Sequence, residues 1–340
     1  MKNNHKVEII AEIGVNHDGS FEKSIKLIQN AKKSGADTVK FQTLFASEFV
    51  KRDTKKVLYQ SKTTSRKESH YDMIKKLELE EYDFLRIINF CKKIKINFLS
   101  TPYDLKSLAM LKKLKAPRYK TSSADLVDIM LHKEIIKTRK PVIISTGASK
   151  LEEIEKTVKL YEKANQTKIT LLHCVSNYPC NINNINLNVI KTLSKKFGYP
   201  VGYSDHSNSD YPAMISIALG AKVIERHFTL NKKSSGPDHK ASSDPKDLLE
   251  YVNKIRLAEK ILGSYKKKVQ KEEEGVRKIS RKSFTLRNSI KKGQLIKEKN
   301  LIMKRPGTGL TGNRIKEIIG KKVKRYLPED YQPKKKDLYN

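Results

Sequence analysis

Tryptophan is absent from this 340-residue sequence, and aromatic residues make up only 7% of it. Scarce aromatics argue against the stacking surfaces on which proteins bind single-stranded nucleic acids. The only cysteines, Cys91, Cys174 and Cys180, are odd in number and lack metal-ligand spacing, so we expect reduced thiols. No apolar run approaches the roughly 20 residues of a membrane span, and no signal-peptide core precedes the first strand-like segment. We therefore expect a cytoplasmic location and no membrane partner.

Acidic residues are also few, because 37 Asp and Glu stand against 71 Lys and Arg, which gives a formal net charge of +34. A basic excess can attract nucleic acids, anionic membranes or anionic small molecules. The lysines are spread along the chain, often on the polar faces of helical segments. We interpret the charge as favouring phosphate and carboxylate substrates over a nucleic-acid partner.

Short apolar segments alternate with amphipathic helical segments from residue 7 onward. Buried parallel strands joined by helices imply right-handed crossovers, and eight strands imply closure into a (β/α)8 TIM barrel. A doubly wound open sheet is the alternative, but the Gly-rich phosphate turn after its first strand is missing. The eight predicted strands are residues 7–14, 37–43, 96–102, 118–123, 141–147, 168–174, 201–205 and 222–228.

Two stretches depart from this alternation. Residues 44–80 are highly charged and too polar for a core, so we expect a rim insertion with one short helix. The barrel is predicted to occupy residues 1–263, followed by a linker or exposed helix at 264–278. Brief strands and turns then predict a small domain at 279–340. Residues 264–340 carry 24 Lys and Arg against 8 Asp and Glu, so this basic lobe would suit an anionic substrate site.

Two lysines interrupt otherwise apolar strands, Lys40 in TVKFQT and Lys120 in RYKTS. A buried lysine is costly unless it meets a carboxylate or another anion. An internal ion pair, such as Lys40 with Glu12, is the simplest explanation for one lysine. Two lysines with several strand-end hydroxyls better fit a bound phosphate plus a carboxylate. The hydroxyls belong to Ser123, Ser145 and Ser204.

Two later strands lead into histidines, His206 and His227. In a barrel both would project into the cup at the C-terminal ends of the strands, where this fold carries its chemistry. With carboxylates at Glu12, Asp205 and Asp238 expected nearby, the pair predicts a divalent metal. Mn²⁺ is the first choice, and Mg²⁺ and Zn²⁺ are alternatives. A Ser–His–Asp hydrolase fits poorly because no nucleophile elbow is present.

Several motifs follow one another over almost the whole chain: AEIGVNHDGS, VKFQT, FLSTPYD, YKTSSADL, VIISTG, LLHCVSNYP, GYSDHS, VIERHFTL, GPDHKAS and KRPGTGL. In this order they resemble the sialic acid synthases. The resemblance implies a barrel followed by an antifreeze-like (SAF) domain. It also implies condensation of phosphoenolpyruvate with an N-acylated amino sugar, with release of phosphate. In that family a domain-swapped homodimer places the SAF domain of one subunit over the barrel mouth of the other.

The resemblance further implies roles for individual residues. Lys40, Lys120, Ser123, Ser145 and Ser204 match contacts to phosphoenolpyruvate, and His206 and His227 match metal ligands. Glu12, Gln42, Tyr178, Asp238 and Arg305 match contacts to the sugar, with Arg305 supplied by the partner subunit. Asp125 stands where some members carry Glu. The predicted catalytic set is Glu12, Asp125, Lys40 and Lys120.

The choice of acceptor stays open at this level. N-acetylmannosamine is the first choice, which would make the product N-acetylneuraminate. A legionaminic or pseudaminic acid synthase would use a 2,4-diacetamido-2,4,6-trideoxyhexose with the same fold and catalytic set. From a different class, the basic C-terminal domain could instead be a polyanion-binding module.

Overall fold

The computed structural model describes residues 6–56, 64 and 68–339 of the chain. The chain forms two compact units, Met1–Gly263 and Ser264–Asn340, which are described separately. Within the described residues, no helix has the length and apolar character needed to cross a membrane.

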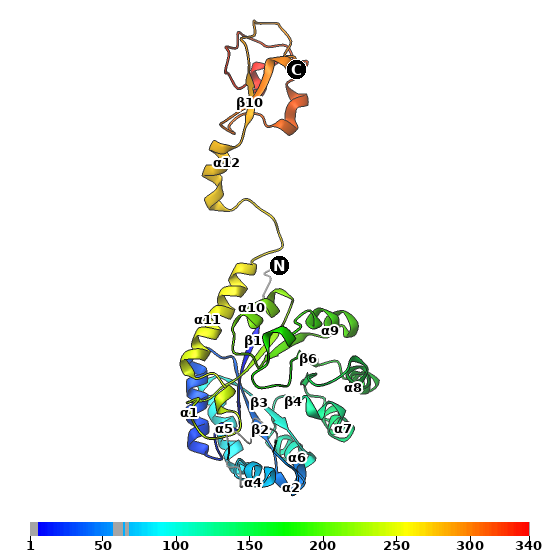
Figure 1. Ribbon diagram of the computed structural model, residues 1–340. Coiled ribbons are helices and arrows are strands. Elements are labelled where there is room, and N and C mark those ends of the chain that lie inside the picture. The colour runs from blue at the N-terminus through cyan, green and yellow to red at the C-terminus, as the bar shows by residue number, and fades with distance from the viewer. Residues whose placement is uncertain (1–5, 57–63, 65–67, 340) are drawn as a thin grey trace. The chain divides into compact units, whose positions relative to one another are not determined.

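The first unit is a closed barrel of eight parallel strands, hydrogen-bonded in chain order with β8 paired to β1 (Figure 1). This confirms the predicted (β/α)8 TIM barrel. The strands are β1 (Glu8–Gly14), β2 (Thr38–Thr43), β3 (Asn97–Pro102), β4 (Tyr119–Thr121), β5 (Val142–Ser145), β6 (Ile169–His173), β7 (Val201–Asp205) and β8 (Val223–His227).

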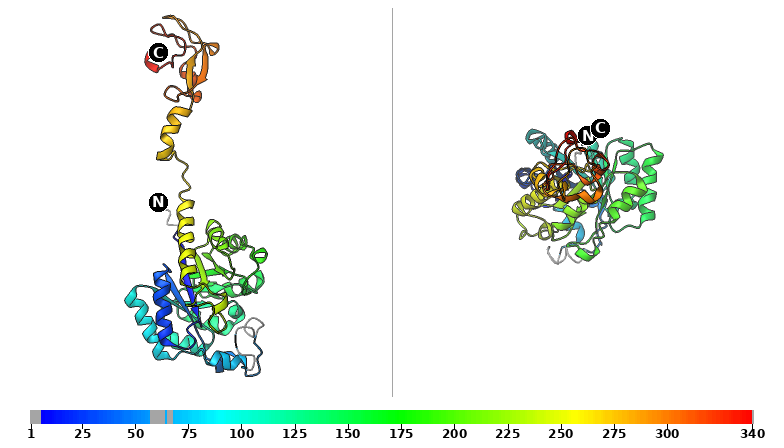
Figure 2. Two further views of the ribbon diagram at one scale, coloured as in Figure 1. Left: turned by 60° about the vertical axis from the view of Figure 1, so that its left-hand side comes forward. Right: turned by 90° about the horizontal axis from the view of Figure 1, so that it is seen from above.

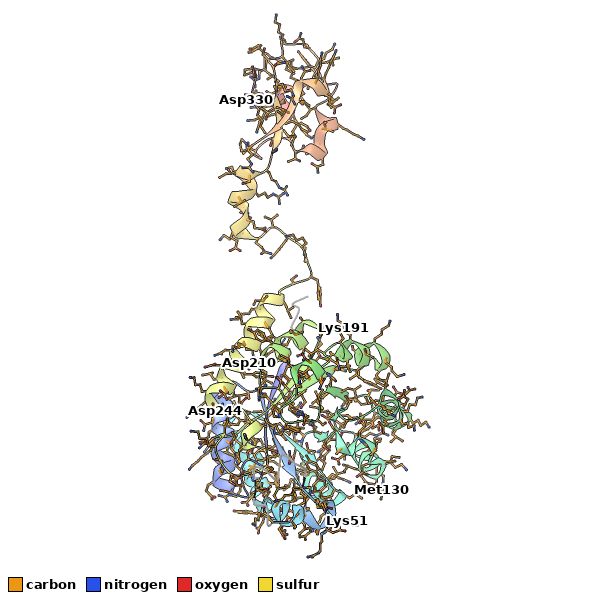
Figure 3. The ribbon with its side chains drawn as sticks, viewed as in Figure 1. Lys51, Met130, Lys191, Asp210, Asp244 and Asp330 are labelled. Atoms are coloured by element: carbon orange, nitrogen blue, oxygen red, sulfur yellow. The ribbon has the colours of Figure 1, made fainter. Side chains whose placement is uncertain are left out.

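Amphipathic helices surround the strands, as two further views show (Figure 2). In the first helix, α1 (Phe21–Lys33), Ser20 caps the N-terminus, and Leu27, Ile28 and Ala31 are buried on the face toward the barrel. Met130 and Lys191 lie at the outer edge of the helix ring (Figure 3). The helices are α1 (Phe21–Lys33), α5 (Glu81–Ile94), α6 (Leu105–Lys113), α7 (Ile129–Lys137), α8 (Leu151–Lys163), α9 (Val189–Phe197), α10 (Tyr211–Ala218) and α11 (Pro245–Leu262).

A small apolar cluster fills the interior of the barrel. It consists of Ile10, Leu99, Ile143, Leu172 and Val223, one from each of five strands. Because side chains alternate along a strand, the residues two positions later point to the same side. These residues are Glu12, Thr101, Ser145, Cys174 and Glu225. A polar layer therefore lies directly above the apolar cluster, toward the C-terminal ends of the strands.

The insertion at residues 44–80 differs from the prediction in two respects. Its described part contains two short helices instead of one, α2 (Ala46–Phe49) and α4 (His70–Lys75). It also has a buried apolar cluster, although the segment seemed too polar for a core. The cluster contains Val15, Leu44, Ala46, Val50, Met73, Ile74 and Leu77. Residues 57–63 and 65–67 of this insertion lie outside the described residues.

The second unit contains an antiparallel pair of strands, β9 (Ser283–Leu286) and β10 (Leu301–Lys304), and several short 3₁₀ turns. Its own apolar core includes Phe284, Leu286 and Val323. The region predicted as linker or exposed helix carries α12 (Glu274–Ser280), all of whose residues are exposed.

Candidate active site

The C-terminal ends of the barrel strands surround a cavity of about 240 Å³. Residues from all eight strands or the loops that follow them line it, as expected for the site of this fold. Ten of the predicted residues lie in the lining: Glu12, Lys40, Gln42, Lys120, Ser123, Ser145, Tyr178, Ser204, His206 and His227. The structure thus brings together most of the residues that the sequence singled out.

Two lysines and two glutamates form the charged floor of this cavity. Lys40 Nζ lies 2.8 Å from Glu12 Oε2 and 3.8 Å from Glu225 Oε2. Lys120 Nζ lies 3.4 Å from Glu225 Oε1. None of these side chains is more than 6% exposed. The ion pair considered for Lys40 and Glu12 therefore exists, but as part of a cluster that faces the cavity.

The charges in this cluster act on one another strongly because water is excluded. Burial raises the pKa of Glu225, but the Lys120 and Lys40 ammonium groups outweigh it and hold that pKa at about 2. Burial lowers the pKa of Lys120, and the Glu225 carboxylate offsets only part of this. Burial raises the pKa of Glu12 despite its contact with Lys40. Glu225 is therefore a fixed negative charge, and Glu12 is the carboxyl that accepts a proton more readily.

Hydroxyl groups and a thiol crowd together around Gly147 at the end of β5. The Gly147 amide donates to Ser123 Oγ at 3.1 Å, and Ser123 Oγ lies 3.2 Å from Cys174 Sγ. Ser145 Oγ is 3.8 Å from the same sulfur. A Cβ on Gly147 would lie 2.4 Å from Ser176 Oγ, 2.6 Å from Cys174 Sγ and 2.8 Å from Ser123 Oγ. Glycine is thus required here by close packing.

The two predicted metal ligands lie on neighbouring strand ends, with ring centroids 5.7 Å apart. His206 Nδ1 is 2.7 Å from the Val175 carbonyl, so this nitrogen is the donor and Nε2 keeps its lone pair, 3.2 Å from Ser204 Oγ. His227 Nδ1 is buried without a hydrogen-bond partner, 3.8 Å from Asp238 Oδ2. Burial lowers the pKa of both histidines to about 3.

Neutral imidazoles with accessible lone pairs are suited to bind a divalent metal. The hydrogen bond from His206 Nδ1 to a carbonyl is the kind of support that fixes a metal-binding tautomer. Within the described residues, no three His, Cys, Asp or Glu side chains cluster closely enough to hold a metal alone. The two histidines therefore fit a metal whose remaining ligands come from substrate or water.

The residues predicted to contact the sugar come from elements on both sides of these histidines, since Tyr178 follows β6 and Gln42 belongs to β2. Gln42 Nε2 donates to Glu12 Oε1 at 3.0 Å. The Tyr178 ring packs against both imidazoles, with its centroid 4.1 Å from that of His206 and 5.3 Å from that of His227. Asp238 does not line the cavity, but its carboxylate lies beside His227, and its side chain is 14% exposed. Burial and the nearby Glu12 charge raise its pKa to about 6.

Three other predicted residues lie outside the cavity lining. Asp125 sits behind it, accepting a 2.6 Å hydrogen bond from Ser122 Oγ, and burial raises its pKa. Arg305 belongs to the second unit, where it is exposed after β10. Asp205 was expected near the metal, but this was wrong. It points outward, 2.8 Å from Arg226 and 2.9 Å from the Tyr251 hydroxyl, because side chains alternate along β7.

Several cavity residues were not assigned a role from the sequence. Glu225 is the most consequential, since it pairs with both lysines and accepts a 3.0 Å hydrogen bond from Ser204 Oγ. Its signal was available, because it lies two residues before His227 and therefore on the same face of β8. The remaining unpredicted side chains with polar groups in the lining are Thr101, Tyr103, Ser122 and Ser176.

Comparison with known proteins finds two family models that match this chain. The NeuB family matches residues 27–267, and the SAF domain matches residues 281–331. A relative named N,N'-diacetyllegionaminic acid synthase, from Campylobacter jejuni, is 42% identical over 96% of this chain and 98% of its own length. The human N-acetylneuraminate-9-phosphate synthase is 30% identical over 96% of this chain and 91% of its own.

A solved structure shows the same similarity. The N-acetylneuraminic acid synthetase of Leptospira borgpetersenii, crystallised with citrate, has a TM-score of 0.70 and is 31% identical. The alignment covers 81% of this chain and 93% of that protein. The match to the SAF domain agrees with the small second domain that the sequence predicted.

Proposed function

Because the chain belongs to the NeuB family, we propose that it condenses phosphoenolpyruvate with a 2,4-diacetamido-2,4,6-trideoxyhexose and water to give a diacetylated legionaminic acid and phosphate. The chain is a nonulosonic acid synthase, an enzyme of the phosphoenolpyruvate-dependent C–C bond-forming class. One observation carries the choice of acceptor. The legionaminic acid synthase shares 42% of its residues with this chain, against 30% for the human N-acetylneuraminate-9-phosphate synthase. The relatives thus favour this acceptor over N-acetylmannosamine, the first choice from the sequence.

The charged floor and the hydroxyl groups support binding of the donor. Lys40 and Lys120 would pair with the carboxylate and phosphate of phosphoenolpyruvate, whose charges are costly to desolvate without such partners. Ser123 and Ser145 would donate hydrogen bonds to the same anions, and Ser204 would do so by turning its hydroxyl away from Glu225. Glu12 and Glu225 pair with the two lysines, so neither ammonium group is buried as an unpaired charge. Both ammonium groups are therefore already in position when an anion binds.

His206 and His227 would hold the divalent metal, which supplies Lewis acidity toward the aldehyde oxygen of the open-chain sugar. Mn²⁺ is the proposed ion. Gln42, Tyr178 and Asp238 would orient the sugar so that its aldehyde carbon meets C3 of the donor.

Proton transfer is assigned to Glu12 ahead of Asp125. Water must add at C2 of the donor before phosphate leaves, and this step needs a group that can take and return a proton. Glu12 lines the cavity and burial raises its pKa, whereas Asp125 lies behind Ser122. Glu12 would therefore move the proton directly, and Asp125 would support the Ser122–Ser123 turn.

The test is phosphate release by the full-length protein with Mn²⁺ and phosphoenolpyruvate, measured with each candidate sugar. We expect release that depends on both substrates, with the highest kcat/KM for the 2,4-diacetamido-2,4,6-trideoxyhexose with the configuration that leads to legionaminic acid. A higher kcat/KM for N-acetylmannosamine would overturn the acceptor assignment. No phosphate release with any of the sugars would overturn the proposed function.

A further inference from the structure

A buried polar network joins the loop after β1 to the loop after β8, outside the cavity lining. His239, which is fully buried, lies at its centre. Its Nε2 is 3.0 Å from Asp18 Oδ1, and its Nδ1 is 2.6 Å from Thr229 Oγ1. Because a carboxylate only accepts, Nε2 is the donor to Asp18. The ring therefore connects two loops separated by more than two hundred residues in sequence.

A second chain of hydrogen bonds runs parallel to the first. Asn16 Nδ2 donates to the Phe228 carbonyl and to Ser242 Oγ, both at 2.9 Å. Ser242 Oγ in turn donates to the Asp238 carbonyl at 2.7 Å. The backbone of Asp238 is thus held on one side through Ser242 and on the other by its direct neighbour His239.

Gly236 packs closely against the His239 ring. A Cβ on Gly236 would lie 2.7 Å from His239 Cδ2 and 3.0 Å from its Nε2. Gly236 also has a φ of +151°, which L-residues with side chains rarely adopt. The loop can therefore pass over the imidazole only with glycine at this position.

We propose that Asp18 and His239 are positioning residues that fix the Asp238 carboxylate beside His227 and thereby set the affinity for the sugar. This inference rests on the proposed function, in which Asp238 contacts the acceptor. The donor-binding side chains lie on or next to β2, β4, β5 and β7, which the network does not touch. The network therefore acts on the acceptor and leaves phosphoenolpyruvate binding unchanged.

Asp18 offers a test that spares the core, because its side chain is 34% exposed, whereas His239 is completely buried. In Asp18→Ala the imidazole loses its acceptor, and we expect the KM for the sugar to rise about tenfold. The KM for phosphoenolpyruvate should stay within about twofold, since a lost positioning contact affects one substrate only. Asp18→Asn keeps an oxygen acceptor at the same place and should restore most of the sugar affinity.

The matched control is Lys23→Met, which removes the other partner of Asp18, on its exposed side. We expect this variant to behave like the wild type. A readout that needs no substrate is amide hydrogen exchange, which should accelerate in residues 228–244 of Asp18→Ala and stay unchanged elsewhere in the barrel. Asp238→Asn, measured alongside, should raise the sugar KM at least as much as Asp18→Ala.

Three outcomes would overturn the inference in an active enzyme. One is an unchanged sugar KM in Asp18→Ala while Asp238→Asn raises it. Another is an equal rise of both KM values, as general loosening would produce. The third is an unchanged sugar KM in Asp238→Asn. A wild-type protein without activity would instead contradict the proposed function, and unchanged exchange in residues 228–244 of Asp18→Ala would then still overturn the positioning role.

Discussion

The wall that holds the predicted phosphoenolpyruvate serines depends on one residue without a side chain. A Cβ added to Gly147 would lie only 2.4–2.8 Å from the hydroxyl and thiol groups of Ser176, Cys174 and Ser123. Gly147→Ala should push Ser123 away from the cavity and raise the KM for phosphoenolpyruvate about tenfold, as expected for one lost hydrogen bond to a charged group. Steady-state kinetics with varied donor would measure this.

The control is Gly275→Ala in α12, where a Cβ would meet no atom within 4 Å. This variant should leave both KM values unchanged. A donor KM in Gly147→Ala equal to that of the wild type would show that the serines around Gly147 do not bind phosphoenolpyruvate.

The paired histidines give a second prediction. His206→Ala or His227→Ala removes one of only two nitrogen ligands, so we expect loss of bound Mn²⁺ and a fall in kcat of at least about 100-fold. Metal content and turnover of purified variants would test it. A suitable control is His173→Gln, because His173 Nε2 bonds to the Ile185 carbonyl at 2.6 Å and lies outside the lining. Wild-type rates in excess chelator would refute the metal role.

Among single residues, the sequence identified as functional those side chains that are costly to bury in a strand. Lys40 and Lys120 stood out because buried ammonium groups need an anion. Glu225 was not assigned because its value comes from facing those lysines across the barrel, which only closure of the sheet reveals. Asp205 was misassigned for a related reason. It is next to His206 in sequence, but strand alternation turns it to the outside of the barrel.

Among the elements, the insertion at residues 44–80 has a visible link to the cavity. The Phe49 ring at the end of α2 lies 4.8 Å from the ring of Tyr103, and Tyr103 lines the cavity. The Tyr103 amide also donates to the Thr43 carbonyl, next to Gln42. The insertion therefore supports the part of the wall adjacent to a predicted sugar contact.

Phe49→Ala should loosen Tyr103 and lower kcat/KM for the sugar about two- to tenfold, because an aromatic pair contributes roughly 0.5–1.5 kcal/mol beyond area burial. Phosphoenolpyruvate KM should not change. Phe21→Ala, which removes an aromatic ring packed against Arg86 on the outside of the barrel, is the matched control. Equal effects of the two substitutions on the sugar would argue against a role for the insertion in the site.

The barrel strands and helices were predictable because apolar runs and 3.6-residue periodicity extend over whole elements. The insertion was not, since α2 has four residues and α4 has six, too few to show a period. Its apolar cluster is assembled from Leu44, Val50 and Met73, which are scattered among charged residues. Tertiary contacts alone bring them together.

For the whole molecule, the second unit carries a predicted function of its own. Arg305 is exposed on the segment after β10, and the resemblance assigns it to the sugar site of a partner subunit. Arg305→Ala should raise the sugar KM about tenfold or more and leave the donor KM nearly constant, because a guanidinium lost from an enclosed site costs more than a surface charge. Lys336→Ala, an exposed charge in the same unit, is the control.

The homodimer stays a prediction with a direct consequence for Arg305. Mixing Arg305→Ala with a barrel-inactive His227→Ala variant should restore activity if subunits exchange, since some mixed sites would then have an intact barrel and an intact Arg305. Sedimentation of the wild type would give the mass. A monomeric mass for the wild type, together with an unaltered sugar KM in Arg305→Ala, would refute both the predicted dimer and the predicted role of Arg305.

In the proposed reaction, this barrel joins phosphoenolpyruvate to a diacetamido trideoxy sugar. A competition experiment tests it most directly, with donor, Mn²⁺ and equal concentrations of that sugar and N-acetylmannosamine, and with products separated by mass. The product ratio equals the ratio of the two kcat/KM values. We predict at least tenfold more diacetylated nonulosonic acid than N-acetylneuraminate. An excess of N-acetylneuraminate would overturn the assignment of the diacetamido sugar as the acceptor.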